Sequence, residues 1–192
     1  MRNKVVRIIS VSLGIALIAA SAAFFTARQI KKAQTAVDAS AVIETIETAL
    51  PERSAGVIER RTDNAMPAME IDGTDFIGLL ELPSRNVKLP VASKWSGSDM
   101  AFRPARYLGS AYDGTLIIGG KYESGNFDFA DKIDAGEEIT FTDMTGKSFR
   151  YTADKISHSD NAETETLTDG DYALELFVKK ENTFLIIRCE SV

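Results

Sequence analysis

The sequence predicts an all-β fold, a small closed or half-closed barrel with one or two short helices, preceded by an N-terminal transmembrane helix and a helical stalk. Three observations predict it: an uncharged apolar run near the start, a segment without glycine or proline after it, and a series of short apolar runs separated by turn-forming residues. The 192 residues suit one modest domain plus an anchor. We expect an anchor at 1–27, a stalk and linker at 28–70, and a β domain at 71–192.

The first element is an uncharged run of 18 residues, from Ile8 to Phe25. At about 1.5 Å per residue, such a helix approaches the roughly 30 Å of a bilayer's hydrocarbon core. A cleaved signal peptide is the alternative, because basic residues precede the run and small residues at 20–23 resemble a cleavage site. The run is longer than the apolar region of most signal peptides and continues through Phe24 and Phe25, which favours an uncleaved anchor.

The charge distribution separates the anchor from the rest of the chain. All 28 acidic residues lie after residue 32, while six of the 22 basic residues flank the apolar run. An acidic body is repelled by phosphate backbones, so nucleic acid is a poor partner and a cationic surface or peptide is a better one. We expect a single-pass protein of the cell membrane whose acidic body lies outside the cytoplasm.

The segment between the anchor and the β domain is expected to be a helical stalk and a linker. Residues 28–50 contain no glycine or proline and place apolar residues at helical spacing, and Pro51 ends the pattern. Residues 51–69 are polar, contain Pro67 and show no clear period, which indicates a linker.

After residue 70 the sequence changes to short runs of β-branched and aromatic residues, with turn formers such as Asp72-Gly73 and Thr145-Gly146 between them. Such runs are typical of strands, and 127–133 is expected to form a short helix. The expected strands are Phe76–Leu82, Val87–Val91, Thr115–Ile118, Glu138–Thr142, Ser148–Ile156, Tyr172–Val178 and Phe184–Cys189. We expect Ile117, Leu176, Phe177 or its neighbours, Leu185 and Ile187 to share one core, with alternate residues on each strand facing out.

Several of these segments, in this order, resemble the sortases, the membrane-anchored cysteine transpeptidases of Gram-positive bacteria, and most closely the class B-like members. FIGLLELPSRNVKLPVASKW is similar to the family's opening strands, and RPARYLGSAYDGTLIIGGKY to the segment that normally ends in Ile-Ala-Gly-His. FADKIDAGEEITFTDMTGKSFRYTADKI resembles the family's helix and following hairpin, and LELFVKKENTFLIIRCESV its last two strands. The resemblance covers about 120 residues and implies a sortase-like closed barrel.

Sortase chemistry needs a cysteine nucleophile, a histidine acid and base, and an arginine that stabilises the oxyanion. Position by position, the resemblance places Lys121 at the histidine position and Lys179 at the cysteine position. It places Phe184 at the arginine position, or Thr183 if the shorter turn shifts the register by one. All three catalytic residues are then replaced, and we expect no catalytic residue here.

Cys189 and His158 are the only cysteine and histidine, so the chain forms no intramolecular disulfide and no Cys/His zinc cluster. We expect Cys189 to be a small core residue and His158 to lie in a solvated loop, which disfavours a relocated catalytic pair. The acidic stretch 160–171 leaves open a weak calcium site, and otherwise the sequence predicts neither a metal nor a cofactor.

The function expected from these observations is that of a sortase-like protein without transpeptidase activity. It would bind a peptide, a cell-wall component or a partner at the membrane. Lys121 and Lys179 are the candidate ligand-binding residues, because two ammonium groups in one cleft would suit an anion or a terminal carboxylate. The alternatives are an active sortase-like transpeptidase that uses non-standard residues and a membrane-tethered scaffold.

Overall fold

The computed structural model describes residues 16–26, 39–50, 66–95, 103–160, 167 and 171–192. Two segments before the β domain are helical, 16–26 and 39–49. Across the described residues, no helix combines the length and the apolar character needed to cross a membrane. The first half of the expected anchor and the linker at 51–65 lie outside the described residues.

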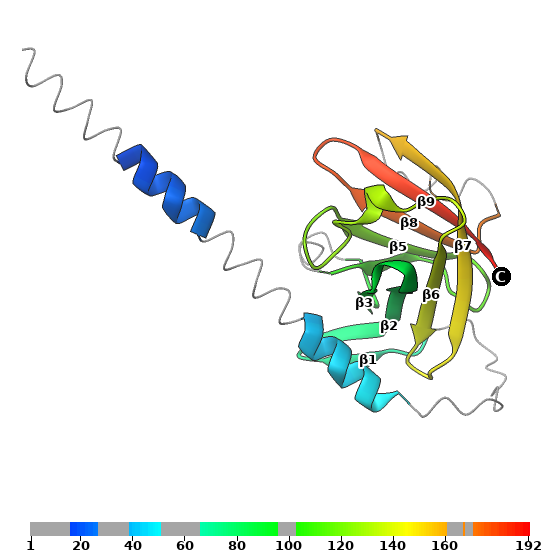
Figure 1. The fold of residues 1–192 in the computed structure, drawn as a ribbon. Coiled ribbons are helices and arrows are strands. Elements are labelled where there is room, and N and C mark those ends of the chain that lie inside the picture. The colour runs from blue at the N-terminus through cyan, green and yellow to red at the C-terminus, as the bar shows by residue number, and fades with distance from the viewer. Residues whose placement is uncertain (1–15, 27–38, 51–65, 96–102, 161–166, 168–170) are drawn as a thin grey trace, which may run out of the picture.

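Eight strands form a closed barrel (Figure 1). They are β2 (Thr74–Leu82), β3 (Val87–Ala92), β4 (Ala105–Leu108), β5 (Leu116–Lys121), β6 (Glu138–Asp143), β7 (Ser148–Ser159), β8 (Leu174–Lys179) and β9 (Phe184–Ser191). The order around the barrel is β2-β3-β4-β5-β8-β9-β7-β6, and β6 pairs back with β2 to close it. A short strand, β1 (Met69–Ile71), extends the sheet beside β2, and two 3-10 turns, η1 (Pro83–Arg85) and η3 (Ala130–Lys132), complete the fold.

The turns follow from the local sequence. Asp72 and Gly73 connect β1 to β2 with φ values of 49° and 75°, the two positive values that a tight hairpin with right-handed strand twist requires. Between β6 and β7, one carboxylate oxygen of Asp143 accepts the backbone N–H groups of Thr145 and Lys147 at 2.8 and 3.0 Å. Both hairpins are thus encoded by short-range interactions.

All seven expected strands are present, with ends shifted by a few residues. Two strands were not predicted, β1 and β4. They are three and four residues long, too short for a period of two to be recognised. The short helix expected at 127–133 is confirmed only in part, since the 3-10 turn η3 covers three of its residues.

The expected common core is confirmed except for Ile117, because the apolar residues divide between two sides of the sheet. Leu176, Leu185 and Ile187 face the main core inside the barrel, whereas Ile117 and Phe177 belong to a separate cluster. Neighbouring strand residues point to opposite faces, so a continuous run of buried residues such as LELFV supplies both. The strands β5, β8 and β9 are therefore covered on their outer as well as their inner side.

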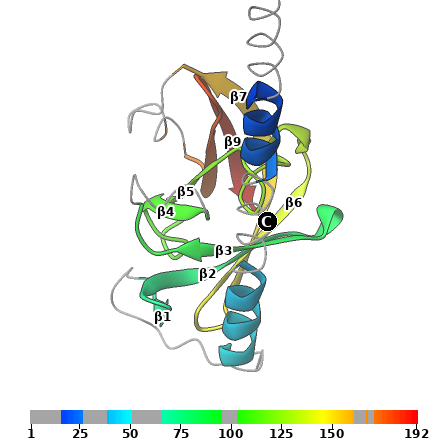
Figure 2. The ribbon, with the colours of Figure 1, turned by 90° about the vertical axis from the view of Figure 1, so that its left-hand side faces the viewer.

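Helix 39–49 packs on the outside of the barrel beside β1 and β2 (Figures 1 and 2). Ile46 is fully buried in a small cluster with Phe76 and Leu79, both from β2. Glu47 forms an ion pair with Lys88 of β3. The C-terminal part of the segment expected to form a stalk therefore contributes to the packing of the β domain.

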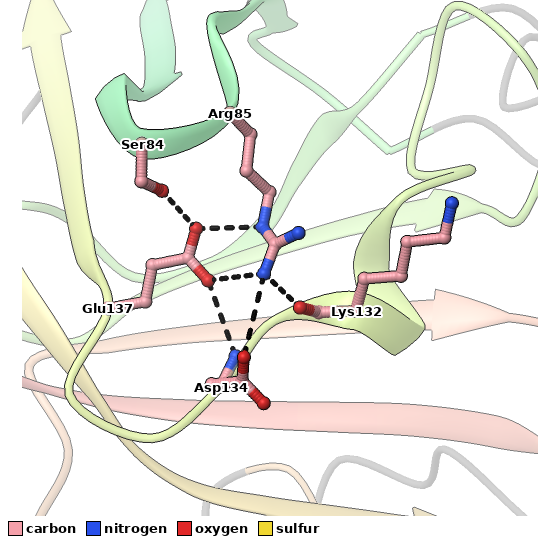
Figure 3. Close-up of polar contacts among 5 residues, drawn as sticks. All are labelled: Ser84, Arg85, Lys132, Asp134 and Glu137. Atoms are coloured by element: carbon pink, nitrogen blue, oxygen red, sulfur yellow. Dashed lines mark hydrogen bonds and ion pairs between the residues drawn. The ribbon is translucent and has the colours of Figure 1, made fainter.

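An ion pair fastens η1 to the loop that precedes β6 (Figure 3). The guanidinium group of Arg85 donates to both carboxylate oxygens of Glu137, at 2.7 and 2.8 Å, and Ser84 donates a third hydrogen bond to the same carboxylate. Burial opposes the charged form of Glu137, but these hydrogen bonds outweigh it and hold its pKa below the ordinary value of 4.5. The charged pair therefore stabilises the folded state.

We expect Glu137→Gln to lower the free energy of unfolding by about 1–3 kcal/mol at neutral pH, because the substitution replaces a bidentate charged contact in a mostly buried site. A group with a depressed pKa contributes its stability above the pKa of the unfolded state, here near 4.5, and loses it as the pH falls through the folded value. The difference between parent and variant should thus shrink in acid. Urea unfolding at neutral and acidic pH measures it.

The matched control is Glu138→Gln, one residue along, where the side chain is exposed. It should change the stability by less than about 0.5 kcal/mol. An equal loss in both variants, or a loss in Glu137→Gln that does not depend on pH, would contradict a specific role for the ion pair.

Candidate functional site

The three residues singled out from the sequence lie in one row across three neighbouring strands. Lys121, the last residue of β5, is the Cα partner of Lys179, the last residue of β8. Lys179 is in turn the partner of Phe184, the first residue of β9, so Phe184 rather than Thr183 lies opposite it. Residues directly opposite one another in a ladder point to the same face. The fold therefore brings all three side chains to one end of the sheet, on one side.

This row lies on the outer face of the barrel. Two residues further along the strands, the next row on the same face is Gly119, Phe177 and Ile186. The residues between the two rows, such as Val178 and Leu185, face the main core instead. The lysine row thus borders the second apolar cluster and not the barrel interior.

The second cluster is mainly aromatic. The ring of Phe177 lies 4.9 Å from that of Trp95, 5.2 Å from that of Tyr107 and 6.5 Å from that of Phe184. We call these four residues the aromatic shelf. Tyr107 reaches it through a bulge in β4, because Arg106 and Leu108 pair with consecutive residues of β5 and leave Tyr107 unpaired.

Gly119 makes this packing possible. A Cβ atom at this position would lie 2.2 Å from Cζ of Phe177 and 2.3 Å from Cζ3 of Trp95. These distances are far below any van der Waals contact, so both rings rest directly on the bare backbone of β5. The pair of glycines at 119 and 120 is therefore a packing requirement, since a Cβ at Gly120 would meet Asn126 and Phe127 on the other face.

Positive charge is concentrated beside the shelf. Lys121 is half-buried and Lys179 is exposed, and no ion pair joins either to an acidic residue within the described part of the chain. Two acids of the barrel are engaged elsewhere: Glu175 accepts a hydrogen bond from Arg188 at 2.8 Å, and Asp131 is 3.5 Å from Lys180. Glu175 therefore does not neutralise the lysine row.

Lys180 differs from its neighbour Lys179. Its ammonium group lies 4.3 Å from the ring centre of Tyr122 and forms the ion pair with Asp131. The hydrogen bond from the Tyr122 hydroxyl, together with Lys180, holds the pKa of Asp131 below its ordinary value. Two consecutive lysines thus have different surroundings, because successive side chains of a strand point to opposite faces. Lys179 lies on the face that carries the shelf, and Lys180 is paired with Asp131.

Cys189 and His158 do not form a catalytic pair. Cys189 is fully buried in the main core, as expected, and burial raises the pKa of its thiol to about 12. The expected loop position of His158 is wrong: it lies in β7, exposed, opposite Leu185, because β7 continues to Ser159 along β9. Leu185 and Cys189 are four residues apart on β9, roughly 13 Å at strand spacing.

The described residues contain no group of three or more acidic, histidine or cysteine side chains that could hold a metal ion. Most of the acidic stretch considered as a calcium site, 161–166 and 168–170, lies outside the described residues. Sequence reasoning missed the aromatic shelf. The alternating apolar residues of β8 and β9 were its only signal, and nothing in the sequence placed Trp95 and Tyr107 against them.

We expect the thiol of Cys189 to resist alkylation in the native protein. A thiol with a pKa of about 12 is almost entirely protonated at neutral pH, and the reactive form is the thiolate. Mass spectrometry after iodoacetamide treatment should show little adduct in buffer and one adduct per chain in denaturant. Complete labelling of the folded protein at neutral pH would show instead that the cysteine is accessible and reactive.

No protein-family model matches the sequence, and no curated protein matches it. Several solved structures do. Sortase A from Corynebacterium diphtheriae superimposes with a TM-score of 0.55 at 17% identity, over 62% of this chain and 61% of that one. Sortase C1 from Streptococcus agalactiae gives 0.54 at 22% identity, over 64% of this chain and 70% of that one. Sortase C from Clostridium perfringens, solved with the C-terminal cell wall sorting motif, gives 0.53 at 19% identity, over 68% and 78%.

The chain thus spans less than two thirds of the C. diphtheriae sortase A. Because the identities are low, the likeness concerns the arrangement of the strands. The assignment of Lys121, Lys179 and Phe184 to the catalytic positions therefore stays a prediction. The resemblance noted in the ordered strand segments is confirmed at the level of the fold. The closed eight-stranded barrel and its superposition on several sortases show that this chain has the sortase fold.

Proposed function

We propose that this protein is a sortase-like protein without transpeptidase activity that binds an anionic group at the row formed by Lys121 and Lys179. One observation supports the proposal above the others. The register of β5 and β8 places the two lysines directly opposite each other, at the ends of their strands and on one face. An acceptor placed between two ammonium groups is attracted by both, and a carboxylate or phosphate supplies the oxygens for it.

The chemistry of the row argues against covalent catalysis by the sortase mechanism. An amine does not form the thioester on which that mechanism depends, and the phenyl ring of Phe184 donates no hydrogen bond to an oxyanion. The single cysteine is enclosed in the core with a raised pKa. An active transpeptidase with non-standard residues would therefore need a nucleophile other than a thiol. Neither the lysines nor the phenylalanine of the row supports such a mechanism.

We further propose that the protein is held at the cell membrane by its N-terminal segment, with the barrel outside the cytoplasm of a Gram-positive cell. The uncharged run from Ile8 to Phe25 supports this proposal. So does helix 16–26, on which large apolar side chains are exposed: Leu17, Ile18, Phe24 and Phe25. A ligand would then be a peptide or another cell-wall component within reach of the membrane.

The test of the binding site is titration of the full-length protein, purified in detergent, with a short peptide that ends in a free carboxylate and with the same peptide amidated. The free acid should bind more tightly. The double substitution Lys121→Ala/Lys179→Ala should weaken its binding roughly tenfold, because each partly solvated lysine contributes on the order of 1 kcal/mol or less. Added salt should weaken binding to the parent as well.

Lys180→Ala is the matched control, because its ammonium group is already paired with Asp131. It should bind the acid as the parent does. Equal binding of acid and amide, or a double variant that binds like the parent, would show that the lysines are only solvated and would favour the scaffold alternative. Cleavage of a sorting-type peptide by the purified protein would establish an active enzyme instead.

A further inference from the structure

The lysine row and the aromatic shelf form one continuous surface. Phe184 belongs to both, since it lies opposite Lys179 in the ladder and its ring is 6.5 Å from that of Phe177. Phe177 is in turn one row away from the lysines, on the same face. Two rows on one strand face are separated by two residues, about 7 Å. The distance between the cationic row and the aromatic surface is thus short enough for a single residue of a ligand to span it.

The shelf keeps part of its aromatic surface accessible. Of its four rings, Phe177 is buried, whereas Trp95, Tyr107 and Phe184 are only half-buried. Partly exposed tryptophan and tyrosine side chains in a cluster next to charged groups are typical of sites where a partner binds, because each ring offers a large apolar area at little cost in conformational entropy.

The rings are held in place rather than loosely placed on the surface. Trp95 and Phe177 rest on the backbone of Gly119, and Tyr107 meets both of them edge-on, with centroid distances of 5.9 and 5.2 Å. A surface fixed by such packing is already ordered before a ligand arrives, so a ligand loses less free energy in ordering it.

We propose that the anion bound at Lys121 and Lys179 is the terminal carboxylate of a peptide whose last side chain is aromatic or large and aliphatic, and that the aromatic shelf receives this side chain. The inference rests on the proposed function and adds the ligand class to it. A C-terminal residue carries its carboxylate and its side chain on the same Cα, which suits two subsites one row apart. The net charge of −6 repels anions from much of the remaining surface, so the local cations also select the site.

The experiment compares three peptides with the full-length protein: one ending in a free phenylalanine acid, one ending in a free glycine acid, and the phenylalanine peptide amidated. Trp95 is the only tryptophan of the chain, so its emission reports directly on the shelf. The phenylalanine acid should bind at least about fivefold more tightly than the glycine acid, as expected for partial burial of a ring. It should also shift the emission of Trp95, while the glycine acid leaves the emission nearly unchanged.

A pair of variants adds a second measurement, by anisotropy of a labelled peptide. Trp95→Leu should bind both acids with nearly equal affinity. Phe149→Leu is the matched control, because Phe149 is also a half-buried ring that packs on a tyrosine, Tyr112, but belongs to the main core, and it should keep the preference for phenylalanine.

The outcomes separate the two proposals. If both acids bind equally and only the amide is rejected, the anion site stands and the shelf does not receive a side chain. If the amidated phenylalanine peptide binds as well as the acid, the lysine row is not an anion site and the proposed function fails. If the acid binds without any change in the emission of Trp95 in the parent protein, the shelf proposal fails even where Trp95→Leu does not fold.

Discussion

The parallel pairing of β5 with β8 is the constraint on which the candidate site depends. These strands are distant in sequence, and a hairpin cannot join parallel strands, so the chain between them runs through β6 and β7 before it returns. The pairing is continuous over six residues, from Leu116 opposite Leu174 to Lys121 opposite Lys179. A shift of the register by one residue would turn one lysine toward the core and leave the other outside.

The same pairing divides the apolar residues into two populations with different tasks. One face of β5, β8 and β9 closes the barrel interior, where burial of aliphatic side chains supplies most of the stability. The other face carries the aromatic shelf and, one row further from the lysines, the buried ion pair between Glu175 and Arg188. A buried pair of this kind gives little net stability, because the loss of hydration offsets much of the attraction between the charges.

The site chemistry follows from this arrangement. Lys121 and Lys179 stand at strand ends on the outer face, where one is half-buried and the other exposed. Cys189 experiences the opposite environment: it faces the core, where burial disfavours the thiolate. One sheet therefore carries the lysines on its outer face and encloses the only thiol of the sequence in the core.

The sequence by itself determined seven of the nine described strands, the hairpin turns and the resemblance that led to the barrel. These depend on short-range features: β-branched runs, Asp-Gly pairs and their order along the chain. It also identified Lys121, Lys179 and Phe184. It did not determine β4, the strand position of His158, the separation of Ile117 from Leu176, or the shelf built on Gly119. Only the tertiary structure decided these, because each depends on which residue of a distant strand lies opposite, and local sequence carries no information about that register.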